Sequence, residues 1–289
     1  MTRMSAQTEY HRPETIDSVC EMLEELSDPT IVAGMQSLGL LMKEGIVSPE
    51  TLVDINGVEG LDGIEREDDH VRLGAIANHR DVECSEIVTE GVPVLATAAS
   101  EIADLQIRNA GTIGGATAYA DPTGDYPPVL MALDATIVSR TTDDELEREA
   151  GEFFTGFYEC ALGPSELLTE IRVPTIGDGE GTGYEKLAYR ENDRAIVNVA
   201  TYLSLEDDRC GSARIVVGSV SDRPVFAPDA ADSLVGTAVT DDDIAEAAEA
   251  TAEEVPIDPD PTVSVDYRRS MVRNLTEKTL QTAREEGHQ

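Results

Sequence analysis

Positive charge is scarce in this chain, and lysine is the scarcest basic residue. Three lysines (Lys43, Lys186 and Lys278) stand among 21 basic residues, against 58 acidic residues and a formal net charge of −37. Nucleic acids and anionic membranes are bound through Lys and Arg side chains that neutralise phosphates, so this charge excludes both as partners.

The excess of acidic residues also indicates the solution in which the protein works. Such a surface repels itself at low ionic strength, and molar salt shortens the Debye length to about 3 Å. We therefore expect a protein of a halophile with a salt-filled cytoplasm. The alternative is an ordinary acidic protein with a cationic partner, but the charge is spread along the whole chain.

Long apolar runs are missing as well. No stretch approaches the roughly 18 apolar residues that a membrane-spanning helix needs, and the opening MTRMSAQTEYHR has no apolar signal-peptide core. We expect a cytoplasmic protein without a membrane span. A length of 289 residues is enough for about two domains with cores of their own.

Cysteine and histidine are few and scattered. The cysteines, at positions 20, 84, 160 and 210, form no C-x-x-C pair, which excludes an iron–sulfur or zinc-ribbon motif and does not indicate a disulfide framework. The four histidines form no H-E-x-x-H motif, so zinc hydrolase chemistry has no support. We expect no metal site and interpret the cysteines as small buried hydrophobic residues.

Common nucleotide-binding and hydrolase signatures are also absent. The chain has no G-x-G-x-x-G fingerprint and no G-x-S-x-G elbow. The Walker pattern fails because Leu40 stands where a lysine would follow Gly34 and Gly39. A dinucleotide site in this chain would therefore be of a less common type.

The most informative segment is RNAGTIGGATAYADPTGD, from Arg108 to Asp125, with glycines at positions 111, 114 and 115. Glycine permits positive φ and lets a ligand approach the main chain. Successive N–H groups in such a turn can form a concave site that suits phosphate. A lone glycine pair is more often a tight turn between core elements. Here the threonines, the aspartates and a second glycine loop favour a binding site.

That second loop is IVAGMQSL, residues 31–38. An apolar run over residues 30–33 indicates a buried strand, which Gly34 ends. Gln36 and Ser37 follow where the next helix should begin. The first N–H groups of a helix lack internal partners, so this position is suited to an anion.

These loops resemble those of the FAD-binding medium subunit of the molybdenum hydroxylases, the family of xanthine dehydrogenase and aerobic carbon monoxide dehydrogenase. The resemblance runs nearly end to end, and the order of its segments is far more specific than a single GTIGG. It is carried by YHRPETIDSV (10–19), AGMQSL (33–38), LVDINGVEGL (52–61), VRLGAIANH (71–79), RNAGTIGG (108–115), ADPTGDYPPVLMALDA (120–135), EFFTGF (152–157), YEKLAYRENDRAIVNVA (184–200) and DYRRSMVRNL (266–275).

The resemblance implies FAD as the only cofactor of this chain, with its pyrophosphate between the two glycine loops, and no catalytic residue. The implied contacts are Ala33, Gly34, Met35, Gln36, Ser37 and Leu38 in the first loop, Thr112, Gly114 and Gly115 in the second, and then Asp125, Leu168 and Lys186. Asp125 matches an acidic position that contacts the cofactor, Lys186 a basic residue near the flavin, and Leu168 an apolar residue packing on the cofactor.

A few positions depart from the family or allow another interpretation. Met35 stands where relatives commonly have Gly or Asn, and Ala116 where many have Asn or Asp. Both changes are tolerable if main-chain N–H groups hold the phosphate, but they leave side-chain contacts there open. The alternative for Lys186 is a solvated surface lysine, and we expect Arg190 and Arg194 to form surface ion pairs.

The implied function is that of an electron-transfer oxidoreductase subunit. A large molybdopterin-binding subunit would oxidise the substrate. Electrons would pass through [2Fe–2S] clusters of a small subunit to FAD here, and then to an external acceptor. The implied assembly is a dimer of heterotrimers. Two alternatives stay open: a free-standing FAD oxidoreductase on the same fold, and a cofactor-free scaffold. Neither substrate nor acceptor can be inferred, since in this family the substrate pocket lies on another chain.

Hydrophobic spacing predicts an α+β chain. It predicts helices near 16–26, 94–105, 241–255 and 267–284, and strands near 30–33, 52–55, 71–75, 135–139, 199–205 and 213–220. The resemblance implies a two-lobed FAD-binding domain of the vanillyl-alcohol-oxidase/PCMH type over residues 1–176, with lobes of about 1–58 and 59–176. A smaller C-terminal α/β domain of the carbon monoxide dehydrogenase flavoprotein type follows over 184–289. The glycine- and acid-rich stretch between them indicates a linker at 177–183.

Overall fold

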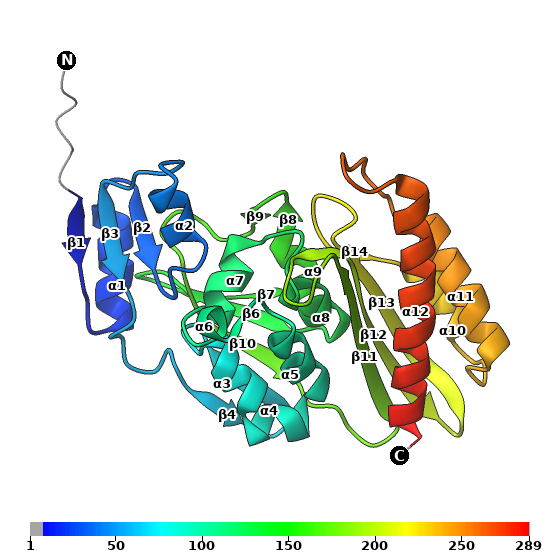
Figure 1. Ribbon diagram of the computed structural model, residues 1–289. Coiled ribbons are helices and arrows are strands. Elements are labelled where there is room, and N and C mark those ends of the chain that lie inside the picture. The colour runs from blue at the N-terminus through cyan, green and yellow to red at the C-terminus, as the bar shows by residue number, and fades with distance from the viewer. Residues whose placement is uncertain (1–7, 289) are drawn as a thin grey trace.

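Three larger sheets, besides one two-stranded hairpin, follow one another along the chain in the computed structural model, which describes residues 8–288 (Figure 1). The first is parallel, in the order β1-β3-β2, and consists of β1 (Glu9–His11), β2 (Pro29–Val32) and β3 (Thr51–Asp54). Helices α1 (Ile16–Glu25) and α2 (Leu38–Lys43) accompany it. A capping box between Thr15 and Ser18 begins α1, and its buried face packs Val19 and Leu23 against Val53.

The second sheet is antiparallel, in the order β4-β5-β10-β6-β7. Its strands are β4 (Ile64–Arg66), β5 (His70–Gly74), β6 (Thr136–Arg140), β7 (Glu145–Glu149) and β10 (Leu167–Pro174). The segments between them form α3 (His79–Cys84), α4 (Glu86–Gly91), α5 (Pro93–Ser100), α6 (Leu105–Arg108), α7 (Ile113–Tyr119), α8 (Tyr126–Ala132), α9 (Ala150–Phe153) and the hairpin of β8 (Phe154–Gly156) and β9 (Glu159–Cys160). Together they enclose the largest hydrophobic cluster.

One predicted helix is divided in two. Apolar spacing through residues 94–105 predicts one continuous helix, but α5 ends at Ser100. Ala103 adopts a left-handed φ of 40°, which a helix cannot continue through. Asp104 then caps α6, its carboxylate accepting the N–H of Ile107 at 2.9 Å. The chain therefore turns before it enters the second glycine loop.

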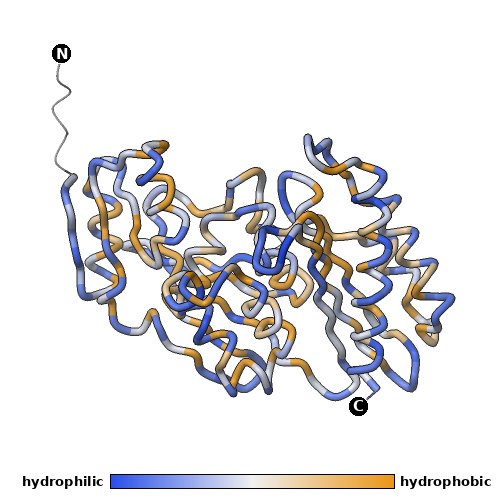
Figure 2. The backbone as a smooth tube through the Cα atoms, in the orientation of Figure 1, coloured by the Kyte–Doolittle hydropathy of each residue, from blue (hydrophilic) through white to orange (hydrophobic). Residues whose placement is uncertain are grey.

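The third sheet is an antiparallel meander, in the order β11-β12-β13-β14. It consists of β11 (Glu180–Ala188), β12 (Ala195–Glu206), β13 (Arg209–Gly218) and β14 (Val225–Phe226), followed by α10 (Pro228–Leu234), α11 (Asp241–Glu254) and α12 (Val265–Gly287). One face, with Val197 and Val199, packs on these helices. The other face adds Tyr184, Ala200 and Val216 to the core of the preceding domain. Most of α12 is hydrophilic in Figure 2, as expected of a helix that buries one face.

The glycine-rich stretch predicted as a linker is partly a strand. Residues 180–183 form the start of β11. Gly181 and Gly183 lie directly beneath α12: an ideal Cβ at Gly181 would lie 1.7 Å from the carbonyl oxygen of Ala283, and one at Gly183 would lie 2.2 Å from that of Thr279. These glycines permit close packing of a helix on a strand, whereas composition suggests flexibility. The linker interpretation is wrong for these four residues.

The cysteine interpretation is confirmed only in part. Cys20 and Cys210 are buried, Cys160 is half-buried, and Cys84 is exposed. Across residues 8–288, no helix has the length and apolar character required to traverse a bilayer.

Replacing Gly183 with Ala should destabilise the protein by about 2 kcal/mol or more, because the added methyl group forces α12 away from β11. Gly151→Ala is the matched control, since nothing lies within 4 Å of its Cβ position. Urea unfolding in molar KCl measures both. A flexible linker would instead tolerate Gly183→Ala or gain stability from it, so an unchanged or higher unfolding free energy would contradict the packing argument.

Candidate functional site

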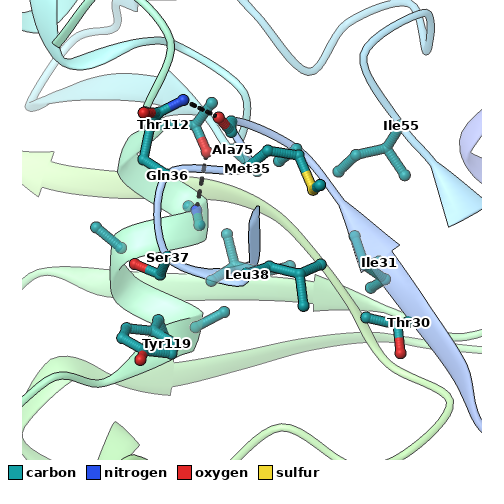
Figure 3. Close-up of a pocket in the computed structure, with 18 of the residues that line it drawn as sticks. Thr30, Ile31, Met35, Gln36, Ser37, Leu38, Ile55, Ala75, Thr112 and Tyr119 are labelled. Carbon is teal, nitrogen blue, oxygen red and sulfur yellow. Dashed lines mark hydrogen bonds between the residues drawn. The ribbon is translucent and has the colours of Figure 1, made fainter. Parts of the chain in front are cut away.

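A pocket of about 340 Å³ lies between the loop that follows β2 and helix α7 (Figure 3). Its volume is within the range of small-molecule sites, roughly 300–1,000 Å³. Of the predicted cofactor contacts, Ala33, Gly34, Met35, Gln36, Ser37, Leu38, Thr112, Gly114, Gly115 and Leu168 line it. Asp125 and Lys186 do not. The two glycine loops, far apart in sequence, thus face one cavity.

The second glycine loop forms a rigid wall. Thr112 caps α7, and its Oγ1 accepts the N–H of Gly115 at 3.1 Å, as drawn in Figure 3. The N–H groups of Ile113 and Gly114 donate to the carbonyl oxygens of Ala77 and Ala75, each at 2.9 Å. These N–H groups are therefore already paired within the chain. The expectation that they form a phosphate nest is wrong for residues 113–115.

Close packing explains the glycines of this loop. An ideal Cβ at Gly114 would lie 2.5 Å from the carbonyl oxygen of Ala75, and one at Gly111 would lie 2.7 Å from Nε2 of His79. The loop glycines at 111, 114 and 115 are not among the described residues with positive φ. Their function is to let α7 approach β5 and α3.

The first glycine loop supplies free donors. Among residues 8–288, no oxygen accepts the main-chain N–H groups of residues 34–38. An ideal Cβ at Gly34 would lie 2.2 Å from the carbonyl oxygen of Ala110 and 2.7 Å from Cα of Gly111, so the two loops are in backbone contact there. The Gln36 side chain donates to the carbonyl of Gly34 at 2.7 Å and braces the turn (Figure 3). A row of unpaired N–H groups beside a cavity is suited to an anion.

The backbone conformation at position 35 explains why relatives commonly have Gly or Asn where this chain has Met35. Its φ of 58° is left-handed, a conformation that Gly adopts freely and Asn tolerates. This is the reason that Gly or Asn suits the position, and Met35 adopts the same backbone at a cost of about 1–2 kcal/mol. Ala116, the other departure, also lines the pocket and offers only a methyl group there.

Asp125 and Lys186 form a buried pair at the third sheet. The Nζ of Lys186 lies 3.0 Å from Oδ1 of Asp125 and donates to the carbonyl of Glu101. The Lys186 side chain is only 3% exposed, so the surface-lysine alternative is wrong. Burial raises the pKa of Asp125, while the Lys186 charge and a hydrogen bond from Tyr184 oppose that rise. The expected surface pair of Arg194 is confirmed, at 3.4 Å from Asp121.

The comparisons with known proteins agree with this arrangement. Residues 5–176 match the FAD binding domain in molybdopterin dehydrogenase, and residues 182–283 match the CO dehydrogenase flavoprotein C-terminal domain. The chain belongs to this family. It is an oxidoreductase flavoprotein of the medium-subunit type, and its cofactor is FAD. The predicted fold class is thereby confirmed, an FAD-binding domain followed by a C-terminal domain.

Relatives of this medium subunit match along nearly their whole length. The chain is 33% identical over 271 residues to the nicotine 6-hydroxylase medium subunit of Paenarthrobacter nicotinovorans, covering 94% of this chain and 95% of the relative. It is 33% identical over 276 residues to the carbon monoxide dehydrogenase medium chain of Hydrogenophaga pseudoflava, with 95% and 96% covered. A chain in the solved carbon monoxide dehydrogenase of H. pseudoflava has a TM-score of 0.92 at 33% identity, with 97% and 98% covered.

The pocket of this flavoprotein subunit fits a dinucleotide. The unpaired N–H row on the first loop is suited to a pyrophosphate, and Ile31, Ile55 and Leu168 make other parts of the wall apolar. Gly34 keeps the two loops close enough to share one cavity. In the described chain, no group of three or more His, Cys, Asp or Glu side chains is placed to hold a metal ion.

Sequence reasoning missed several wall residues of the flavoprotein pocket, among them Ile31, Ile55, His79 and Tyr119. Ile55 and His79 lie inside segments that resemble the family, LVDINGVEGL and VRLGAIANH, and that resemblance is the signal that could have identified them. His79 is 5% exposed; its main-chain N–H donates to the Gly111 carbonyl at 2.9 Å, and its ring Nδ1 lies 3.3 Å from the Tyr126 hydroxyl. Burial, with Arg108 nearby, lowers its pKa to about 4. A neutral imidazole therefore packs against the second loop, where only a glycine at position 111 leaves room for its Nε2.

The depressed pKa of His79 makes stability depend on pH. An unfolded imidazole takes up a proton below pH 6.5, and the folded one only near pH 4. Unfolding free energy should therefore fall by up to about 3 kcal/mol as the pH decreases through this window. His79→Gln removes the imidazole and leaves all carboxylates in place. In urea unfolding at constant KCl, its unfolding free energy should therefore lack this part of the pH dependence. Parallel slopes for the two proteins would exclude the effect.

Proposed function

We propose that this chain is the electron-transfer subunit of a molybdenum-containing hydroxylase or dehydrogenase, with FAD bound across the two glycine loops. The observation that carries the proposal is the row of unpaired N–H groups at residues 34–38, held against the second loop by the contact at Gly34. These groups hold the pyrophosphate. When bound, FAD supplies the redox chemistry by accepting electrons and passing them on.

The remaining predicted residues have distinct functions in this proposal. Thr112, Gly114 and Gly115 form the rigid wall opposite the N–H row, and Leu168 packs on the cofactor. Asp125 and Lys186 lie at the flavin end. Asp125 is next to Tyr126, whose hydroxyl contacts His79 in the pocket wall, and this continuity supports their placement along the same extended cofactor.

The partners in this proposal are a large molybdopterin-binding subunit and a small subunit with [2Fe–2S] clusters, assembled as a dimer of heterotrimers. The names of the matched relatives, a medium subunit and a medium chain, support a multi-subunit assembly. The clusters of the small subunit would supply electrons, and the FAD held by this chain would deliver them to an external acceptor. A free-standing FAD oxidoreductase remains the alternative. The N–H row and the cavity argue against a cofactor-free scaffold.

The proposed setting is the salt-rich cytoplasm of a halophile. The net charge of −37 supports it, because a chain so acidic is relieved of self-repulsion when molar salt screens its charges.

The visible spectrum of protein purified in molar KCl tests the cofactor site. Flavin bands, with extracted FAD at near one per chain, are expected for the wild type. Gly34→Ala should weaken FAD binding at least tenfold, about 1.4 kcal/mol, because the methyl group pushes the two loops apart. Gly39→Ala is the matched control: its Cβ would make only ordinary contacts with Met35, at 3.6 and 3.7 Å. A folded, colourless wild type that refuses added FAD would reject the proposal.

Lys186→Met tests whether the buried ammonium acts on the flavin. Removing this positive charge should lower the flavin midpoint potential by about 30 mV or more, equivalent to ~1.4 kcal/mol for two electrons. Lys186→Arg keeps the charge and should retain a potential close to that of the wild type. Spectroelectrochemistry of the holoprotein measures all three, and equal potentials would remove this role from Lys186.

A further inference from the structure

One face of the third sheet directs a row of polar residues at the loop that carries Asp125. Tyr184 and Lys186 are two positions apart on β11 and share that face. Lys186 is paired in register with Asn198 on β12, and Asn198 with Gly218 on β13. An ideal Cβ at Gly218 would lie 2.2 Å from Oδ1 of Asn198, so glycine leaves room for the amide.

These residues form a chain of hydrogen bonds that ends on Asp125. The Ser219 hydroxyl donates to Oδ1 of Asn198 at 3.2 Å. The amide of Asn198 donates to the Tyr184 hydroxyl at 3.3 Å and to the Gly124 carbonyl at 2.9 Å. The Tyr184 hydroxyl in turn donates to Oδ1 of Asp125 at 2.6 Å. Asn198 is 0%, Ser219 5% and Tyr184 9% exposed, so water competes little for these bonds.

The two oxygens of Asp125 have different surroundings. Oδ1 accepts from Tyr184 and faces the Lys186 ammonium at 3.0 Å. Oδ2 accepts no hydrogen bond from any residue between 8 and 288. The side chain keeps 11% of its surface exposed. Oδ1 is thus held by the protein, and Oδ2 is free to accept a further hydrogen bond.

We propose that Tyr184 is a positioning residue: it holds Asp125 as an oriented, ionised acceptor for a hydrogen-bond donor of bound FAD, and Asn198 fixes the Tyr184 hydroxyl for that purpose. This inference rests on the proposed function. It goes further by assigning to the C-terminal domain a direct part in organising the cofactor site of the preceding domain.

The electrostatics of the cluster support this role. Burial raises the pKa of Asp125, and so does the nearby carboxylate of Glu101. The Lys186 charge and the Tyr184 hydrogen bond lower it. Tyr126 is the other titratable neighbour, and burial raises its pKa far above the ordinary value, so it stays neutral. The Tyr184 hydroxyl is therefore one of two groups that oppose the rise in the pKa of Asp125 and favour its charged form.

Tyr184→Phe removes this hydrogen bond and keeps the aromatic ring. Full-length protein stripped of flavin is titrated with FAD in molar KCl from pH 5 to pH 9, and the dissociation constant is read from flavin fluorescence. We expect Tyr184→Phe to weaken binding about tenfold at pH 7, the size of a hydrogen bond to a charged group. The acid-side loss of affinity should begin at higher pH than in the wild type.

Tyr202→Phe is the matched control for that variant. Tyr202 lies in the same sheet, and its hydroxyl also donates to a carboxylate, that of Glu180. It should match the wild type in affinity and in pH profile. Thermal unfolding of each variant shows that the comparison is between folded proteins.

A double-mutant cycle with Asp125→Asn separates positioning from a structural effect. Asp125→Asn cannot ionise, so its FAD affinity should lose the acid-side dependence, and adding Tyr184→Phe should change nothing further. Additive losses would overturn the positioning role, as would a folded Tyr184→Phe protein with the wild-type affinity and pH profile. Either result leaves FAD binding by the wild type intact. A wild type that binds no FAD would overturn both this inference and the proposed function.

Discussion

The backbone contact between the two glycine loops is the constraint on which the rest of this site depends. Gly34 lies so close to Ala110 and Gly111 that no side chain fits between them. This contact holds the loop after β2 against the loop before α7 and leaves the cavity beside it. The two loops differ in their hydrogen bonds. The N–H groups of residues 113–115 are paired within the chain, whereas among the described residues those of 34–38 have no partner and can bind a ligand. One loop is a rigid support and the other is the binding surface.

A second constraint is that the third sheet contributes one face to each of two hydrophobic cores. One face of the sheet packs on α10–α12, and the opposite face completes the core around α5 and α8. Gly181 and Gly183 bring α12 onto β11, which stiffens the strand carrying Tyr184 and Lys186. A charged pair such as Asp125 and Lys186 is tolerated in this interface because hydrogen bonds from the same strand satisfy it. The C-terminal domain thereby becomes part of the site's frame.

Local patterns predicted those features that local chemistry decides. The apolar spacing of α1 and α11 is strong, and both helices also have capping boxes, so their existence and limits follow from neighbouring residues. Patterns failed where the backbone adopts a left-handed turn or where a distant segment packs closely. The helix expected over residues 94–105 ends at Ser100, ahead of the left-handed turn at Ala103, and the stretch rich in glycine around residue 181 is a strand under a helix. In both cases the deciding contacts or backbone angles are invisible in composition.

The family, the α+β class, FAD as cofactor and ten of the residues that line the pocket follow from the amino-acid sequence alone, because ordered motifs and glycine spacing are properties of the chain. Which N–H groups remain free and which charges are buried follows from the folded chain and not from local sequence. The N–H groups of Ile113 and Gly114 donate to the carbonyl oxygens of Ala77 and Ala75, which lie in a distant part of the chain. The Lys186 ammonium is buried against Asp125 and Glu101. Hydrogen bonds and burial depend on which distant groups come together in space, and local sequence does not specify that.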